Sequence, residues 1–463
     1  MAAPTLNREI LRLAVPALGA LVAEPLFLIV DAALVGHLGV VPLAGLGIAS
    51  AVLQTIVGLM VFLAYSTTPA VAGRFGAGDH ADAVRAGVDG LWLALGLGVV
   101  LAIAGSLATP ALVSLFGAAP DVSHQALIYL QLSMWGLPAM LIVFAATGLL
   151  RGMQDTVTPL WIAGIGFALN AALNALFIYG FGWGIAGSAA GTVAAQWGMV
   201  GAYAIVIGRL AQRHSASLRP QRDGLRGSAA SGGWLFLRTV SLRAAFLATV
   251  FAATALGTDE LAGWQVAFTI FSTAAFALDA LAIAAQALIG RGLGAGDELF
   301  VRRVLGRTVA WGGWFGVIVG AAIAALSGVI GLVFTGSPEV AALVQPALLV
   351  LAVAQPVCGV VFVLDGVLMG AGDVRYLAAV GGLNLVPYLP ALAVLWLVHP
   401  TGAIGLMWLA VCFFGVYMLA RLATLAWRVR RPRVGHRRGV SGRGVTPSGG
   451  TTRTSRPRPP RSR

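Results

Sequence analysis

The chain has 463 residues, of which only 10% are charged and 59% are hydrophobic. Soluble domains carry about a quarter charged residues, so this composition excludes an ordinary soluble domain. The 30 basic residues, all arginine, outnumber 17 acidic ones and give a net charge of +13. Twelve of the arginines lie in residues 428–463, a segment without any acid. The rest of the chain is nearly neutral, which argues against a nucleic-acid-binding body.

The basic segment 428–463 is rich in Arg, Pro, Gly and Ser. It is too poor in apolar residues to fold, so we expect a disordered cytoplasmic tail. Anionic lipids of the inner leaflet would attract this tail with about 1 kcal/mol per arginine near the surface. We expect it to contact membrane lipids and no specific nucleic acid.

Residues 1–427 contain repeated apolar stretches that are long enough to cross a bilayer, which takes about 20 residues of helix. The first runs to Gly36 and is too long for the apolar region of a cleaved signal peptide. The pattern predicts an all-α polytopic membrane protein with twelve transmembrane helices. The predicted spans begin near Arg8, Leu43, Ala83, His124, Thr156, Ile185, Trp234, Leu261, Val304, Val340, Val374 and Gly402.

The arginines are confined to alternate loops between these spans. The intervening loops carry histidine and acidic residues such as His37, Asp121 and His399, and no arginine. The positive-inside rule then places both termini in the cytoplasm, which agrees with an even number of spans. We expect a multi-pass protein of the bacterial inner membrane.

The sequence also repeats itself at an offset of 218 residues. The matching positions are Leu43-Ala44-Gly45 with Leu261-Ala262-Gly263, Gly76-Ala77-Gly78-Asp79 with Gly294-Ala295-Gly296-Asp297, and Gly148, Gly152 and Asp155 with Gly366, Gly370 and Asp373. We infer two pseudo-symmetric six-helix lobes around a central cleft, at residues 1–208 and 234–427, joined by a cytoplasmic linker at 209–233. Parallel repeats of this kind are typical of transporters that expose a site alternately on the two sides.

Charged residues inside a span are costly and usually face a cavity or a partner. The first span carries two, Glu24 and Asp31, and Asp31 lies in its outer half. We interpret Asp31 as a proton-binding carboxylate. Pro16 and Pro25 interrupt the same span, and each removes a helical hydrogen bond, so the helix can bend there.

The fifth and sixth predicted spans carry polar pairs at four-residue spacing, which places each pair on one helix face. These are Asn170 with Asn174, and Thr192 with Gln196. The pairs predict either a polar network at a site or hydrogen bonds that only join neighbouring helices.

In the second lobe, Asp279 and Arg243 lie at similar depth, so we expect a buried ion pair, structural or functional. Asp365 lies near the cytoplasmic end of its span, where we expect it to anchor a helix end or a loop. The two cysteines and six histidines show no metal-ligand spacing, and no nucleotide-binding loop is present. We expect no metal, no cofactor and no catalytic residue.

Three segments carry a family resemblance. Residues 27–39 read Phe-Leu-Ile-Val-Asp-Ala-Ala-Leu-Val-Gly-His-Leu-Gly, residues 151–159 read Arg-Gly-Met-Gln-Asp-Thr-Val-Thr-Pro, and residues 278–286 read Leu-Asp-Ala-Leu-Ala-Ile-Ala-Ala-Gln. Together they resemble the multidrug and toxic compound extrusion (MATE) family, and its DinF-like branch in particular. The resemblance covers residues 8–428.

The resemblance implies ion-driven export of organic, often cationic, compounds. It maps the expected proton site onto Asp31 and the polar network of the first lobe onto Asn170, Asn174 and Thr192. Asn174 stands where a second aspartate is expected. Because an amide does not titrate, Asp31 would act alone or with Glu24. The coupling ion is then a proton rather than Na⁺.

Two other functions remain open from the sequence. A flippase for lipid-linked cell-envelope precursors would need arginines in the central cleft to bind pyrophosphate; the candidates are Arg238 and Arg243. An intramembrane transferase would need a histidine paired with an acid near one membrane face. His37, His124 and His399 have no such partner nearby in the sequence.

Overall fold

The computed structural model describes residues 3–334 and 338–431, and their regular structure is helical. The first half contains α1 (Ala3–Gly36), α2 (Val40–Met60), α3 (Phe62–Gly76), α4 (His80–Ser114), α5 (Pro120–Met134), α6 (Leu137–Gly152), α7 (Val157–Ala175), the π-helical η1 (Leu176–Gly180) and α8 (Gly184–Arg213). The second half contains α9 (Arg222–Leu256), α10 (Thr258–Gly294), α11 (Glu298–Phe334), α12 (Pro338–Gly370), α13 (Val374–Leu383), α14 (Leu385–Val398), α15 (Gly402–Ala410), η2 (Val411–Tyr417) and α16 (Met418–Arg430).

Within the described residues, eleven helical segments are long and apolar enough to cross a membrane. Helices α5 and α6 pass the same test as a pair bent by 48°, which gives twelve. Gly136 and Pro138 stand at this bend, where proline lacks the N–H that would continue the helix. The twelve predicted spans are confirmed.

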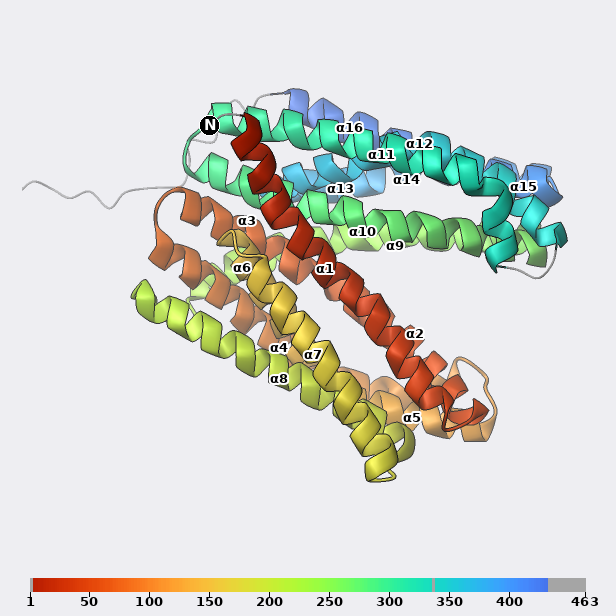
Figure 1. The fold of residues 1–463 in the computed structure, drawn as a ribbon, viewed down its shortest axis with the longest axis horizontal. Coiled ribbons are helices and arrows are strands. Elements are labelled where there is room, and N and C mark those ends of the chain that lie inside the picture. Colours follow the sequence, from red (N-terminus) through yellow and green to blue (C-terminus); the bar gives the residue numbers. More distant parts are fainter. Residues whose placement is uncertain (1–2, 335–337, 432–463) are drawn as a thin grey trace, which may run out of the picture.

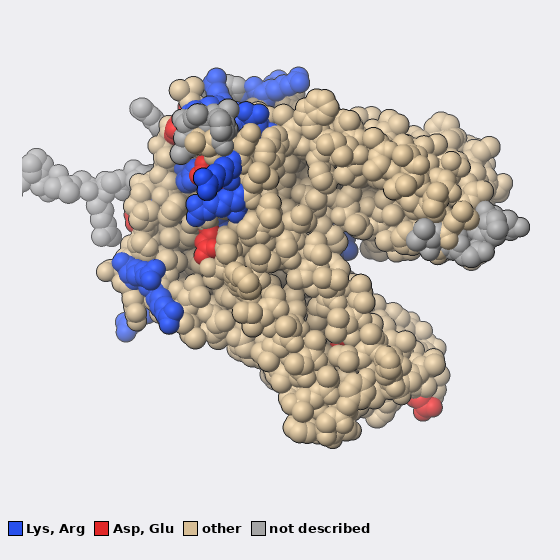
Figure 2. Space-filling view, viewed as in Figure 1, with Lys and Arg blue, Asp and Glu red and all other residues tan. Residues whose placement is uncertain are grey.

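The helices form two lobes that meet at one end and spread apart at the other (Figure 1). One lobe contains α2 to α8 and the other contains α9 to α16. Helix α1 runs obliquely between them and packs on both α7 and α10. It is unbroken through Pro16 and Pro25. The wedge between the lobes is also visible in the space-filling view (Figure 2).

The repeated glycines make equivalent contacts in the two lobes. A Cβ atom at Gly148 would lie 2.7 Å from the carbonyl oxygen of Ala64, and one at Gly366 would lie 2.5 Å from that of Ala282. Ala64 and Ala282 are themselves 218 residues apart. The duplication predicted from the sequence therefore brings α3 against α6, and α10 against α12, by the same absence of a side chain.

A second glycine pair lies where the lobes touch. A Cβ atom at Gly76 of α3 would overlap the carbonyl group of Arg291, and one at Gly294 of α10 would overlap that of Gly73. The contact is reciprocal, because residues 73 and 76 are repeated at 291 and 294. The backbones of α3 and α10 thus approach each other closely across the pseudo-twofold axis.

Side chains add hydrogen bonds between the lobes in this region. Gln154 Nε2 donates to the carbonyl oxygen of Ala287 at 3.0 Å, and Gln286 Nε2 donates to that of Tyr65 at 2.8 Å. Arginines gather on the surface of the same end of the molecule (Figure 2). The lobes are therefore joined at the arginine-rich end and open at the other.

The connection between the lobes is shorter than the expected linker at 209–233. Helix α8 continues to Arg213 and α9 begins at Arg222, which leaves eight residues, 214–221, without regular helix. Its last residue is tied to α4, because the Gln221 N–H donates to Asp89 Oδ1 at 2.9 Å. At the other end of the lobe, α16 continues to Arg430, so the expected tail does not begin at residue 428. Residues 432–463 lie outside the described part.

Candidate functional site

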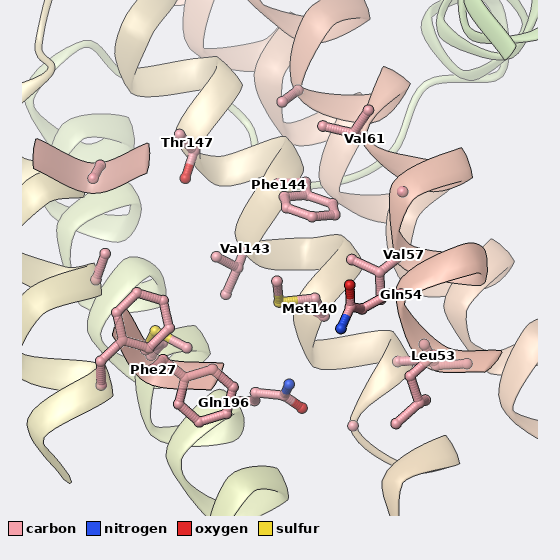
Figure 3. A pocket seen from close by; sticks show the side chains of 18 of the residues that line it. Phe27, Leu53, Gln54, Val57, Val61, Met140, Val143, Phe144, Thr147 and Gln196 are labelled. Atoms are coloured by element: carbon pink, nitrogen blue, oxygen red, sulfur yellow. The ribbon is translucent and has the colours of Figure 1, made fainter. Parts of the chain in front are cut away.

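A cavity of about 500 Å³ lies at the base of the wedge between the lobes. Most of its wall comes from α1, α2, α6 and α8 of the first lobe, and α9 and α10 close one side. Figure 3 shows its largely apolar lining, with the aromatic rings of Phe27 and Phe144, the thioether of Met140 and the amides of Gln54 and Gln196. A volume of this size holds one drug-sized molecule.

Asp31 lies in the first lobe, next to this cavity, and is 4% exposed. Three side chains donate hydrogen bonds to its carboxylate. Ser188 Oγ reaches Oδ1 at 2.5 Å, Asn174 Nδ2 reaches Oδ1 at 2.8 Å, and the Tyr129 hydroxyl reaches Oδ2 at 3.1 Å. Such donors stabilise the ionised form of a carboxylate that burial disfavours.

The polar pair on α7 extends this network towards α8. Asn170 Nδ2 donates to Thr192 Oγ1 at 2.9 Å, and Asn174 Nδ2 lies 3.2 Å from Asn170 Oδ1. Asn174 Oδ1 is buried and has no hydrogen-bond partner in the described part of the chain. The structure therefore brings Asp31, Asn170, Asn174 and Thr192 together.

Two members of the network also line the cavity, namely Tyr129 and Thr192. They connect Asp31 with the space that a substrate would occupy. Gln196 lines the cavity too, one helical turn beyond Thr192, and none of the hydrogen bonds found between described residues ties it to Asp31. Its place is in the wall rather than in the network.

The remaining sequence candidates of the first span have mixed outcomes. Pro16 and Pro25 lie inside α1, which continues through both. The side chain of Glu24 is outside the described residues, so its suggested part in coupling stays a prediction.

The expected ion pair between Arg243 and Asp279 is wrong. Both residues line the cavity, but the ion pairs of the described residues do not join them. Arg243 extends from α9 across to α2, where its guanidinium lies against Gly58. Asp279 has no hydrogen-bond partner among the described side chains. Similar depth in sequence did not imply contact, because the two helices present these residues in different directions.

The acid that does pair in the second lobe is Asp365, 5% exposed. It binds Arg238 of α9 and accepts from Arg421 of α16 at 2.8 Å. Asp365 thus joins three helices of the lobe, and the expectation that it anchors a helix end or loop is corrected. Neither Arg238 nor Arg421 lines the cavity.

Sequence reasoning missed three residues of the site. Ser188 lies four residues before Thr192 on the same face of α8, so the spacing that identified Thr192 could also have identified it. Tyr129 is 98 residues from Asp31 in the chain, and Arg151 was assigned to a loop although it ends α6 in the cavity wall. For these two the sequence holds no local signal.

The fold and the site define a class. The chain is a polytopic membrane protein with two repeated lobes, a substrate-sized cavity between them and a buried carboxylate beside that cavity. This is the architecture of a secondary transporter built from parallel repeats.

Comparisons with known proteins identify the family. The MatE family model matches residues 16–176 and 236–390, one segment in each lobe. Protein DETOXIFICATION 44, chloroplastic, of Arabidopsis thaliana is 31% identical over 438 residues, covering 92% of this chain and 82% of that protein. DNA damage-inducible protein F of Escherichia coli K12 is 29% identical over 63% of this chain and 64% of its own length.

Solved structures agree on the fold. The crystal structure of the Vibrio cholerae MATE transporter VcmN in the bent form superposes with a TM-score of 0.83 at 22% identity, over 92% of this chain and 97% of that one. The chain belongs to the MATE family. It is a multi-pass membrane transporter and not an enzyme.

Proposed function

We propose that this protein exports organic compounds by alternating access, driven by protons that bind Asp31. The observation that carries the proposal is the buried Asp31 carboxylate, held by three donors and connected to the cavity through Tyr129. A single titratable group in contact with both the mobile first helix and the cavity wall can link a proton to a substrate.

Protonation changes the role of Asp31 in its network. The ionised carboxylate only accepts hydrogen bonds, whereas the protonated acid must also donate one. Asn174 Oδ1, buried without a partner, is an acceptor next to it. Rotation of this amide lets Asn174 accept from protonated Asp31, at the loss of the bond that its Nδ2 now donates. The α1–α7 contact is rearranged, and α1 bends near Pro16 or Pro25.

This rearrangement alters the cavity because Tyr129 and Thr192 belong to both. Substrate enters while the lobes are open to the cytoplasm and leaves after Asp31 takes up a proton from outside. By the positive-inside rule, the arginine-rich end at which the lobes meet is cytoplasmic. The structure then represents the outward-open state in a bacterial inner membrane, with both termini in the cytoplasm.

The test is transport by the purified full-length protein in proteoliposomes. Rhodamine 6G uptake is measured with an imposed proton gradient or an imposed Na⁺ gradient. We expect uptake with the proton gradient only, and a loss of at least about tenfold in Asp31→Asn, because the amide cannot exchange a proton. Glu260→Gln, an acid on α10 outside the cavity, is the matched control and should retain transport. Uptake by Asp31→Asn equal to that of the unmodified protein would refute the assignment, and uptake driven by Na⁺ alone would refute proton coupling.

A further inference from the structure

The cavity carries more positive than negative side chains. Its lining contains two arginines, Arg151 and Arg243, and one acid, Asp279. Arg151 comes from the end of α6 in the first lobe, and Arg243 comes from α9 in the second. The charged groups of the cavity thus come from both lobes, and they carry a net positive charge even when Asp279 is ionised.

These two guanidinium groups are not used by the structure. Arg238 and Arg421 of the second lobe are neutralised by Asp365, away from the cavity. The described residues contain no ion-pair or hydrogen-bond partner for the side chains of Arg151 or Arg243. Arg151 is only 8% exposed. Asp279 lies within electrostatic range of Arg151 and compensates for one cation at most.

An arginine that is withdrawn from bulk water without a partner is costly, so the arrangement favours a ligand that supplies the missing negative charge. Planar guanidinium groups match carboxylate, sulfonate and phosphate oxygens through paired hydrogen bonds. An organic cation would meet two positive side chains and a single acid in the same space. The charge of the cavity therefore opposes the cationic substrates that the family resemblance implies.

We propose that the substrate is a drug-sized organic anion whose acidic group is bound between Arg151 and Arg243. This inference rests on the proposed export function and specifies its substrate class. The apolar body of the substrate packs on Phe27, Met140 and Phe144, across the cavity wall. The cavity volume of about 500 Å³ fits one such molecule. Because the two arginines belong to different lobes, the anion contacts both lobes at once and its affinity depends on their relative position.

The experiment compares two dyes with the same xanthene ring, the anionic sulforhodamine B and the cationic rhodamine 6G. Binding to the detergent-solubilised full-length protein is measured by fluorescence polarisation without any gradient. Uptake is measured in proteoliposomes with an imposed proton gradient. We expect sulforhodamine B to bind and accumulate, and Arg243→Gln and Arg151→Gln each to weaken its binding by at least about tenfold, through loss of a charge-assisted hydrogen bond.

Two further variants make the result specific. Arg243→Lys keeps the charge but not the planar fork, so it should restore part of the binding. Arg302→Gln removes an exposed arginine on α11 outside the cavity and should leave binding unchanged. Elution as a single peak in size-exclusion chromatography shows that each variant is folded. Arg243 is exposed to the wedge, so its replacement leaves no buried charge unpaired.

The outcomes separate this inference from the proposed function. Proton-driven uptake of rhodamine 6G without binding of sulforhodamine B would overturn the anion site and leave export intact. Binding of sulforhodamine B that is equal in all variants would overturn the arginine assignment. Arginine-dependent binding without uptake of either dye would keep the anion site and refute export. Movement of only a fluorescent short-chain phosphatidic acid between leaflets would replace the soluble substrate with a lipid phosphate.

Discussion

At the residue scale, the site is defined by which polar groups are paired and which are not. Asp31 is satisfied by donors from three other helices, while Asp365 is satisfied by two arginines of its own lobe. Removing one member of a buried ion pair costs about 3–5 kcal/mol, because the remaining charge is left without compensation. Asp365 therefore stabilises the second lobe, whereas Asp31 is free to change its charge as its donors rearrange.

Tyr129 tests the link between Asp31 and the cavity. Tyr129→Phe removes one hydrogen bond to the carboxylate and keeps the ring that packs in the lobe. A hydrogen bond to a charged group contributes about 1.5–3 kcal/mol, so we expect proton-driven dye transport to fall about tenfold. Tyr179→Phe is the matched control, since Tyr179 also donates to α1, but to the Leu34 carbonyl oxygen. Equal transport by both variants would show that Tyr129 has no part in coupling.

At the element scale, the contact between α3 and α10 joins the lobes. Glycines at 76 and 294 let the two helices approach so closely that no side chain fits between them. The contact is small and is supplemented by single hydrogen bonds from Gln154 and Gln286. A close but limited contact of this kind can separate without unfolding either lobe, which alternating access requires.

Gly294→Leu should therefore favour separation of the lobes at this end. Nitroxide labels at Ala77→Cys and Ala295→Cys, exposed and equivalent in the two repeats, report the distance by pulsed electron paramagnetic resonance. Cys358 and Cys412 are buried and are replaced by alanine in this background. We expect Gly294→Leu to lengthen the distance by several ångströms. The control Gly306→Leu, at a glycine with open space around it, should leave the distance unchanged. An unaltered distance in Gly294→Leu would mean that α3 and α10 do not limit the approach of the lobes.

At the scale of the whole molecule, the two lobes and α1 form a wedge that is closed at the arginine-rich end (Figures 1 and 2). Helix α1 contacts α7 of one lobe and α10 of the other, so a change at Asp31 is transmitted to both. The orientation of the wedge in the membrane follows from the arginines and decides which side the cavity faces.

This orientation is measurable with a membrane-impermeant maleimide on single-cysteine variants that lack Cys358 and Cys412. Asp223→Cys, in the first turn of α9, should react in inside-out vesicles and not in intact spheroplasts. Asp121→Cys, at the start of α5, should show the reverse. Both positions are exposed. Labelling of Asp121→Cys from the cytoplasmic side would invert the assigned orientation.

The sequence by itself determined the architecture. Spans of apolar residues follow from the need to satisfy the backbone in lipid, and the offset of 218 residues follows from duplication, so both can be identified without a structure. Asp31, Asn170, Asn174 and Thr192 could be singled out because polar groups inside spans are costly.

Only the tertiary structure decided which of these groups meet. Tyr129 and Asp31 are 98 residues apart, and Asp365 pairs with arginines 127 and 56 residues away. Such contacts depend on the rotation of each helix about its axis, which is set by packing against its neighbours and not by the local sequence. The same rotation places Arg243 and Asp279 in the cavity as separate groups instead of an ion pair, and so determines the charge that a substrate meets.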